Sequence, residues 1–215
     1  FKTNGSTAII ILISALIILF LSDFKIKDII KFFSLSVIIA ASFILVLIYF
    51  TSNSRVDTWK NRIISFFKGE NTYQVDTAKK AIASGKWTGL GPGKSVQKNF
   101  LPHSSSDFIY AILIEEYGAV SGIMILLLYV GFFVRILAIS IRIKMMFPYL
   151  LLLGLGTLIL FQAFLNIGVS LGVIPVTGQT LPLISRGGSS IWITSIAIGV
   201  ILNISSLKFK NGVLV

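Results

Sequence analysis

Apolar runs long enough to cross a lipid bilayer constrain this chain more than any other feature of its sequence. A spanning helix needs about 20 mostly apolar residues, and residues 7–22, 32–50, 108–134, 147–173 and 189–207 reach or approach that length. Hydrophobic residues make up 55% of the chain and charged residues only 13%, which is more apolar than soluble domains are. The sequence therefore predicts an all-α, polytopic membrane protein with about five transmembrane helices.

The composition also excludes several kinds of site. The chain has no cysteine, which rules out disulfides and thiolate metal sites, and its single histidine, His103, cannot form a histidine metal cluster. Nineteen lysines and arginines against eight acidic residues give a net charge of +11. In a membrane protein this excess indicates contact with anionic membrane lipids or phosphorylated substrates, and not with nucleic acid.

A long polar loop, residues 51–106, separates the second predicted span from the third. Within it, Val75, Ala78 and Ile82 recur at helical spacing and predict a short amphipathic helix that Gly85 ends. We expect this helix to lie on lipid headgroups. Because a loop of this length is more than a simple connection, we also expect it to have a function of its own.

Two rules disagree about the side of the membrane on which this loop lies. Alternation of the spans puts the loop opposite the short turn at residues 25–31, whose lysines are typical of a cytoplasmic turn. Counting positive charges instead puts the loop itself in the cytoplasm, because it holds many more basic than acidic residues. The rule weakens for long loops, so we favour the extracytoplasmic side.

The last part of this loop and the residue that follows it, GLGPGKSVQKNFLPHSSSD at residues 89–107, have the composition of an anion-binding segment. The glycines let the backbone approach a ligand closely, and Lys94 and Lys98 supply positive charge for phosphate. The segment is not a nucleotide-binding P-loop, because that pattern requires glycine where Thr88 stands. Asp107 at its end could accept a proton during catalysis or could simply cap the next helix, and the residues alone leave both roles open.

Polar residues inside the later spans also have alternative interpretations. Glu115 and Glu116 are either functional or paired within the protein, or they snorkel together near the membrane interface. Gln162, Asn166 and Ser170 form a polar stripe on one face of a helix. We interpret this stripe as an interhelical hydrogen-bonding seam rather than a substrate path.

The stretch between the last two spans, residues 174–188, is predicted to be an irregular or re-entrant loop. Its prolines and glycines are incompatible with a regular helix. Irregular backbone at membrane depth is tolerated only where it is buried in protein or lines a wet cavity. We therefore expect this loop to lie against other parts of the protein or against a cavity.

Two long motifs in this chain resemble a known family. GLGPGKSVQKNFLPHSSSDFIYAILIEEYG and NIGVSLGVIPVTGQTLPLISRGGSS are similar to stretches of the SEDS family (FtsW, RodA and SpoVE), with the closest similarity to its cell-division branch. The stretches NGSTA, RVDTWKNR and YQVDTAKKAIASG add support at the expected spacing. Family members are longer and the chain begins at Phe1 without an initiator methionine. The resemblance therefore implies a single membrane domain, residues 1–215, that forms the C-terminal half of such a bundle.

The resemblance implies a peptidoglycan glycosyltransferase of the bacterial cytoplasmic (inner) membrane that polymerises lipid II on the outer face. Its implied partners are a class B penicillin-binding transpeptidase and other division proteins. Asp107 matches the proposed catalytic residue, which would deprotonate the GlcNAc 4-hydroxyl of the acceptor as undecaprenyl pyrophosphate leaves. The residues implied to bind substrate are Lys94, Ser95, Gln97, Lys98, Arg186, Gly187, Gly188, Ser189 and Ser190. No metal ligand or certain cofactor is implied, and a divalent cation (Mg²⁺ or Mn²⁺) at the pyrophosphate is a conjecture.

The sequence departs from the family pattern close to Asp107. The family commonly reads P-E-x-H-T-D-F where this chain reads PHSSSDF, so His103 stands at the usual glutamate and Ser105 and Ser106 at the usual His-Thr pair. Arg186 likewise replaces the tyrosine of S-Y-G-G-S-S, and a cation there could suit a phosphate. Roles assigned to the usual residues cannot be carried over, whereas Asp107 itself is unaffected.

Two other classes of function remain as alternatives. A flippase or transporter for a lipid-linked substrate is suggested by the polar stripe and by the carboxylates in the third span. A non-catalytic membrane scaffold that recruits division partners is the third class. A carboxylate at the mouth of a cavity open to the outer leaflet favours the polymerase, whereas a transporter needs a path through the helices.

Overall fold

The computed structural model describes residues 5–22, 27–28, 30–31, 33–39, 42 and 73–210, and within these ranges it contains helices and no strand. The prediction of an all-α protein is therefore confirmed. In chain order the elements are α1 (Gly5–Leu21), α4 (Tyr73–Gly85), the 3₁₀ helix η1 (Gln97–Asn99), α5 (Ile109–Tyr117), α6 (Ala119–Ser140), α7 (Met146–Ser170) and α8 (Gly188–Lys210). The span predicted at residues 32–50 lies largely outside the described residues.

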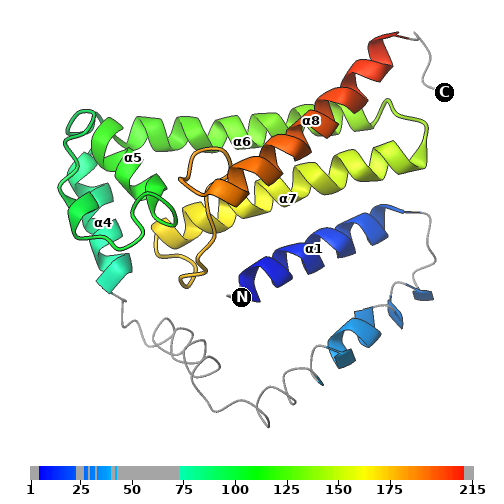
Figure 1. Cartoon of the computed structure of the whole chain (residues 1–215), viewed down its shortest axis with the longest axis horizontal. Coiled ribbons are helices and arrows are strands. Elements are labelled where there is room, and N and C mark those ends of the chain that lie inside the picture. Colours follow the sequence, from blue (N-terminus) through cyan, green and yellow to red (C-terminus); the bar gives the residue numbers. More distant parts are fainter. Residues whose placement is uncertain are drawn as a thin grey trace.

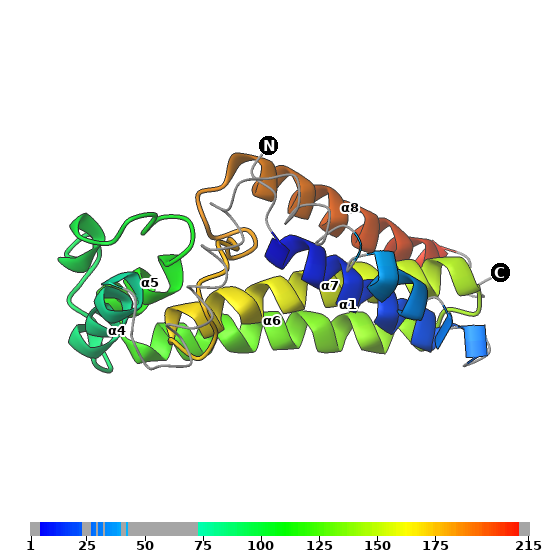
Figure 2. The same ribbon diagram turned by 90° about the horizontal axis from the view of Figure 1, so that it is seen from below.

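Three long helices form the body of the molecule (Figure 1). α6 and α7 run side by side, α1 lies along α7, and α8 crosses α7 at an angle. In the view turned by 90°, α7 lies between α6 and α8 (Figure 2). Ile136, Leu152 and Ile201 come from these three helices and belong to one buried apolar cluster, so the helices share a core.

The long helices have the length and surface of membrane-spanning segments. In the described part of the chain, α6, α7 and residues 188–206 of α8 are long and apolar enough to cross a bilayer, and α1 contains a shorter apolar helix. Leu127 and Leu128 of α6 are 62% and 66% exposed, and Ile193 of α8 is 65% exposed. Apolar side chains in such numbers on an outer face are suited to contact with lipid. The predicted polytopic membrane protein is thus confirmed.

The third predicted span is two helices rather than one. α5 ends at Tyr117, Gly118 has φ 82° and ψ 172°, and α6 begins at the next residue. A Cβ added to Gly118 would lie 2.0 Å from the carbonyl oxygen of Trp87, because the chain that leaves α4 crosses the junction there. The Ala119 N–H also donates to the Lys86 carbonyl at 2.8 Å. The prediction of one helix over residues 108–134 was therefore wrong, because the pattern of apolar residues does not predict this backbone contact.

α4 packs its apolar face against α5 instead of laying it on lipid. The helix and its end at Gly85 were predicted correctly, and Val75, Ala78 and Ala81 are buried on it. A Cβ on Gly85 would lie 2.1 Å from the Ile114 carbonyl oxygen, so the two helices touch backbone to backbone. The expectation that this face lies on headgroups was wrong, because α5 covers it.

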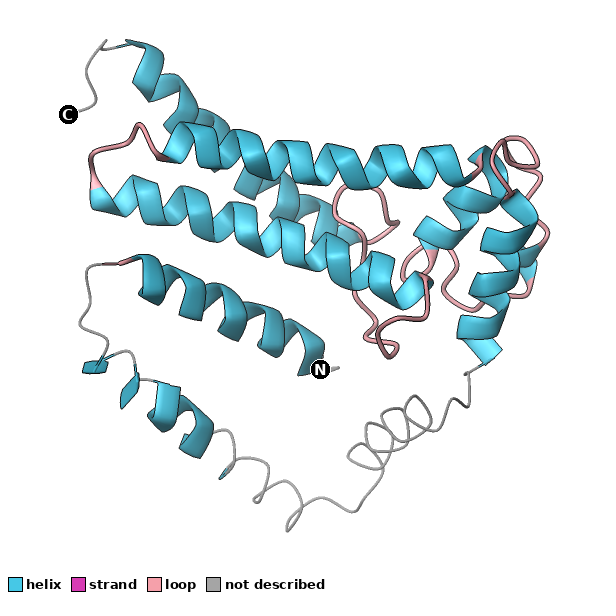
Figure 3. Ribbon diagram, turned by 180° about the vertical axis from the view of Figure 1, so that it is seen from behind, coloured by secondary structure: helices cyan, strands magenta, loops and turns pink. Residues whose placement is uncertain are grey.

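The loops of the molecule gather at the end where α4 and α5 lie. Figure 3 shows the chain between α4 and α5 and the chain between α7 and α8 meeting there, while the α6–α7 turn lies at the opposite end. Residues 171–187, which join α7 to α8, contain turns and no helix. This end of the bundle therefore carries most of the polar and irregular backbone that the structure describes.

We predict that Gly118→Ala destabilises the protein by about 3 kcal/mol or more, because alanine strains at this φ and ψ and its Cβ collides with the Trp87 carbonyl. Gly131→Ala is the matched control, since a Cβ at Gly131 in α6 meets nothing within 4 Å. Thermal unfolding of the purified full-length protein checks the pair. Equal midpoints for the two variants would contradict the predicted backbone contact.

Candidate functional site

Asp107 lies at the junction between the polar loop and α5, and it is half-buried. The N-cap of α5 is Phe108, and no side chain makes a capping hydrogen bond there. The Asp107 carboxylate instead accepts a hydrogen bond at Oδ1 from the Ser106 hydroxyl. Its Oδ2 lies 3.8 Å from the position that a Cβ would take on Gly178. Helix capping therefore does not account for this carboxylate, which faces the loop between α7 and α8.

The loop between α7 and α8 is hydrogen-bonded to the residues just before Asp107. The Arg186 N–H donates to the Ser105 carbonyl at 2.9 Å, and the Ser185 hydroxyl donates to the Ser106 carbonyl. The Ser185 hydroxyl also accepts from the Leu181 N–H at 2.7 Å. These contacts bring the SRGGSS motif beside Asp107, although the two segments are far apart in the sequence.

The Asn166 side chain of α7 binds both segments. This side chain is fully buried, and its Nδ2 donates to the Asp107 carbonyl at 2.9 Å and to the Gln179 carbonyl at 2.7 Å. The side chain of Gln179 then donates to the Thr7 hydroxyl of α1 at 2.8 Å. The predicted interhelical seam is not what the structure shows for this stripe: Asn166 binds loop carbonyls rather than a neighbouring helix, and the buried Ser170 hydroxyl makes no hydrogen bond within the described residues.

Two residues with left-handed backbone occur in the segments around Asp107. His103 has φ 58° and Leu183 has φ 64°, and side chains rarely adopt this region without support from their surroundings. The N–H groups of Ser106 and Asp107 both donate to the His103 carbonyl at 3.0 Å. The turn that presents Asp107 is thus closed by its own backbone hydrogen bonds.

Glu115, two turns into α5, holds the glycine- and lysine-rich part of the loop. It is 0% exposed. Its carboxylate accepts hydrogen bonds from the hydroxyls of Ser84 and Ser95 and from the backbone N–H groups of Val96 and Gln97. Of the two interpretations of the glutamate pair, pairing within the protein is therefore confirmed for Glu115. A buried carboxylate needs this number of donors, and the loop supplies them.

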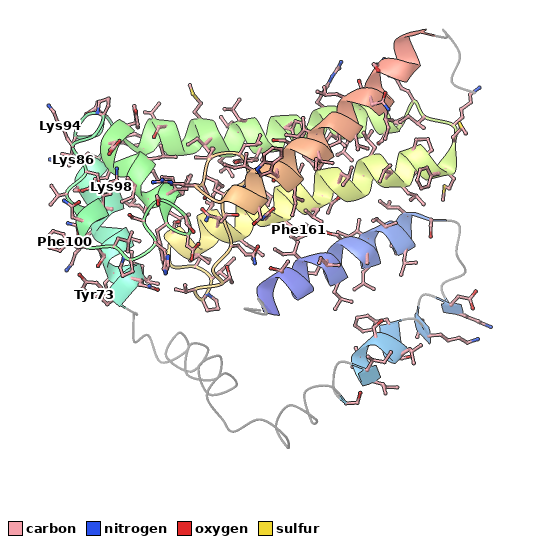
Figure 4. All side chains as sticks on the ribbon, in the orientation of Figure 1. Tyr73, Lys86, Lys94, Lys98, Phe100 and Phe161 are labelled. Carbon is pink, nitrogen blue, oxygen red and sulfur yellow. The ribbon has the colours of Figure 1, made fainter. Side chains whose placement is uncertain are left out.

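The structure uses parts of the predicted substrate-binding loop for this internal contact. The Ser95 hydroxyl donates to Glu115 and accepts from the Lys98 N–H, and the Gln97 N–H also donates to Glu115. The side chains of Lys94 and Lys98 are exposed. Figure 4 shows both lysines at the α4–α5 end of the molecule, with Lys86 and Phe100. The structure thus leaves the two lysine side chains, and not the Ser95 hydroxyl, available to a ligand.

The remaining predicted residues lie where α8 begins. Arg186 and Ser189 are exposed, and α8 starts at Gly188. The Ser190 hydroxyl accepts from the Thr180 hydroxyl at 2.8 Å. A Cβ on Gly187 would lie 3.3 Å from the side chains of Ser190 and Thr180. Gly187 therefore allows the close packing of this turn, whereas Arg186 presents its charge outward.

Sequence reasoning did not single out Gly178 or Ser185. Gly178 has φ 69° and lies against the Asp107 carboxylate, and Ser185 joins the two loops. The glycine could have been found as a turn position inside an irregular stretch. Nothing in the local sequence distinguishes Ser185 from the serines around it, because its partners come from a distant segment.

The described residues do not offer a ligand set for a protein-bound metal ion. Within the described ranges, no group of three or more His, Cys, Asp or Glu side chains comes together. Asp107 and Ser106 alone would give too few ligands for a site held by the protein. The described side chains therefore do not by themselves form a site for the conjectured divalent cation.

Comparison with known proteins decides the family. The sequence model of the FTSW_RODA_SPOVE family, described as a cell cycle protein, matches residues 1–210. The chain belongs to this family. The family resemblance drawn from the two long motifs is thereby confirmed.

The relatives in this family are longer than the present chain. The chain is 44% identical over 135 residues to a probable peptidoglycan glycosyltransferase FtsW of Lactococcus lactis, covering 62% of this chain and 32% of that protein. It is 35% identical over 217 residues to the probable peptidoglycan glycosyltransferase FtsW of Buchnera aphidicola, covering 95% of this chain and 54% of that protein. The chain thus spans between about a third and about half of the curated relatives it matches.

The fold also has a solved counterpart. A chain from a peptidoglycan synthase complex that coordinates polymerization and crosslinking superposes with a TM-score of 0.66, over 95% of this chain and 56% of that chain. The two sequences are 22% identical, so the likeness establishes the fold alone. The solved chain therefore supports the fold, and membership of the family rests on the sequence match.

We predict that Glu115→Ala releases the loop at residues 95–97 without unfolding the bundle. The substitution removes the acceptor of Ser95, Val96 and Gln97, and an unsatisfied partner costs about 1–3 kcal/mol. Amide hydrogen exchange at these residues should become about 10- to 100-fold faster, while exchange in α7 is unchanged.

Glu116→Ala is the matched control for this experiment, because the Glu116 side chain accepts none of these bonds. Its backbone carbonyl, which binds the Gly91 N–H, is kept in the variant. If the two variants exchange at the same rate over residues 95–97, Glu115 does not hold the loop.

Proposed function

We propose that this chain is the C-terminal half of a peptidoglycan glycosyltransferase that polymerises lipid II during cell division. The proposal rests on family membership and on the names of the relatives from Lactococcus lactis and Buchnera aphidicola. The structural observation that supports it most is the convergence of the two family motifs on Asp107. A carboxylate that faces a loop junction and does not cap its helix is available for chemistry.

In the proposed reaction, Asp107 acts as the general base. Its carboxylate takes the proton of the GlcNAc 4-hydroxyl of the acceptor, and that oxygen forms a bond to the anomeric carbon of the growing chain. The bond from this carbon to the pyrophosphate breaks, and its electron pair leaves with undecaprenyl pyrophosphate. Attack opposite the leaving group inverts the anomeric centre. The Ser106 hydroxyl, which donates to Asp107 Oδ1, helps to keep the carboxylate in place.

We propose that exposed basic residues balance the negative charge of the pyrophosphate. Lys94, Lys98 and Arg186 are exposed, so their side chains can reach a ligand. The pyrophosphate is already charged in the bound substrate and gains charge as the bond breaks, so cations within its reach stabilise both the bound substrate and the transition state. Gly188 and Ser189 at the start of α8 provide backbone and hydroxyl groups beside Arg186.

The site is proposed to face outward from the bacterial cytoplasmic (inner) membrane, with residues 51–106 as the extracytoplasmic loop and residues 174–188 as the irregular loop of the site. A class B penicillin-binding transpeptidase and other division proteins are the proposed partners. The likeness to a chain of a peptidoglycan synthase complex fits this arrangement. An outward site would give the enzyme access to lipid II where the glycan strand is built.

A flippase or transporter is a weaker proposal. It was suggested by the polar stripe on α7 and by the carboxylates of the third span. The buried polar groups of Asn166 and Glu115 are committed to hydrogen bonds that hold loops, and these bonds would have to break for a substrate to pass. A scaffold without activity would not require Asp107.

Asp107→Asn is expected to lower lipid II polymerisation by about 10²- to 10⁴-fold, because the amide cannot take the proton. The assay uses purified full-length protein with its transpeptidase partner and measures glycan chains. Asp76→Asn on α4, a half-buried aspartate outside the site, is the matched control and should keep wild-type activity. Wild-type glycan synthesis by Asp107→Asn would sink the catalytic assignment and favour the transporter or the scaffold.

Lys98→Ala is expected to raise KM for lipid II by about 3- to 10-fold and to lower kcat less, because an exposed cation contributes about 1 kcal/mol to an anionic ligand. Lys80→Ala is the control, since Lys80 is also exposed but lies on α4. Initial-rate kinetics across a range of lipid II concentrations separate the two constants. An unchanged KM for Lys98→Ala removes this lysine from the substrate site.

A further inference from the structure

We infer that Asn166 is the positioning residue of the proposed base. Its side chain fixes the position of the Asp107 backbone relative to the Gly178–Gln179 turn, which faces the Asp107 carboxylate. This inference rests on the proposed function of Asp107, and no similarity to another protein assigns it. Two hydrogen bonds of one amide carry it, at 2.9 Å to the Asp107 carbonyl and at 2.7 Å to the Gln179 carbonyl.

The two hydrogen bonds of Asn166 position the two segments that meet at the site. The first fixes the carbonyl of Asp107 and therefore the start of α5. The second fixes the carbonyl next to Gly178, and the Gly178 Cα presents its open side to Asp107 Oδ2, where a Cβ would be 3.8 Å away. One side chain thus sets the spacing between the carboxylate and the loop that faces it.

The amide is itself held rigidly. Asn166 is 0% exposed and lies near the C-terminal end of α7, between the buried residues Ala163 and Val169. Its Oδ1 is buried and makes no hydrogen bond within the described ranges. Rotating the amide by 180° would turn Oδ1 toward two carbonyl oxygens, so the observed orientation is the one with attractive contacts. Burial also removes water that could compete for the two N–H groups.

Few side chains could replace asparagine here. Two carbonyl oxygens require two donors from one short, planar group, which asparagine supplies. Aspartate has the same shape but offers acceptors, so it would repel both carbonyls. Alanine leaves both carbonyls without this donor, and serine keeps a single donor on a shorter stem.

The hydrogen bonds around Asn166 extend to the first helix, α1. Gln179, whose carbonyl Asn166 holds, donates from its side chain to the Thr7 hydroxyl of α1. α1, α7 and α5 are therefore linked through Gln179, Asn166 and Asp107 by hydrogen bonds in series. The position of Asp107 thus depends on the packing of α1 against α7 and not only on its own loop.

The test compares Asn166→Ala and Asn166→Asp with Ser170→Ala in full-length protein with its transpeptidase partner. Ser170 lies one turn further on the same face of α7, and its buried hydroxyl makes no hydrogen bond in the described part of the chain. We expect kcat for lipid II polymerisation, per folded molecule, to fall about 10- to 100-fold in Asn166→Ala, because a small displacement of a catalytic group has an effect of this size. The fall should be larger in Asn166→Asp. KM should stay within about twofold of wild type, and Ser170→Ala should keep wild-type kcat.

A second measurement separates positioning from a loss of stability. If Asn166 acts through Asp107, the double variant Asn166→Ala, Asp107→Asn has the same residual activity as Asp107→Asn alone, whereas a general structural defect lowers it further. If Asn166→Ala does not fold, Asn166→Ser replaces it in both measurements.

Wild-type kcat per folded molecule in the Asn166 variants, or additive losses in the double variant, overturns the positioning role. Reduced kcat with no further loss in the double variant supports it. Full activity of Asp107→Asn instead overturns the proposed function. An inactive Asp107→Asn beside fully active Asn166 variants overturns only the present inference, so the two failures are distinguishable.

Discussion

Buried polar groups must find their hydrogen-bond partners within the protein, and this requirement organises the site end of the molecule. Two segments without regular structure meet there, and buried polar side chains from the helices bind them. Glu115 of α5 accepts from the loop that carries Lys94 and Lys98, and Asn166 of α7 donates to the two segments around Asp107. The helices thus supply polar groups at the two places where the loops lack their own.

Close backbone contact at glycine completes this arrangement. Gly85 and Gly118 bring α4, the following loop and α5 together at distances that no side chain would permit. The short helix α5 also contacts α6 and α7. Asp107 stands at the start of this helix and Glu115 near its end, so one short element connects the proposed base with the anchor of the lysine loop.

The arrangement suits a reaction with a charged, lipid-linked leaving group. Asn166 and Ser185, whose hydrogen bonds hold the segments around Asp107, are buried, whereas the side chains of Lys94, Lys98 and Arg186 are exposed. Fixed polar groups near the reacting centre need little reorganisation during the reaction, whereas exposed lysines can follow a flexible lipid substrate. The same division explains why the buried polar residues of α7 are less suited to a transport path.

The sequence by itself determined the elements that depend on local pattern. Apolar length gave the spans of α7 and α8, helical spacing gave α4 with its end at Gly85, and the charge and position of Asp107 marked the candidate site. Only the tertiary structure decided that Gly118 divides the third span, that Glu115 holds the lysine loop, and that Ser185 and Asn166 join the motifs. Asn166 and Asp107 are 59 positions apart in the sequence, and Ser185 and Ser106 are 79 positions apart. Local periodicity has no information about contacts at such separations, because they arise from the packing of complete helices.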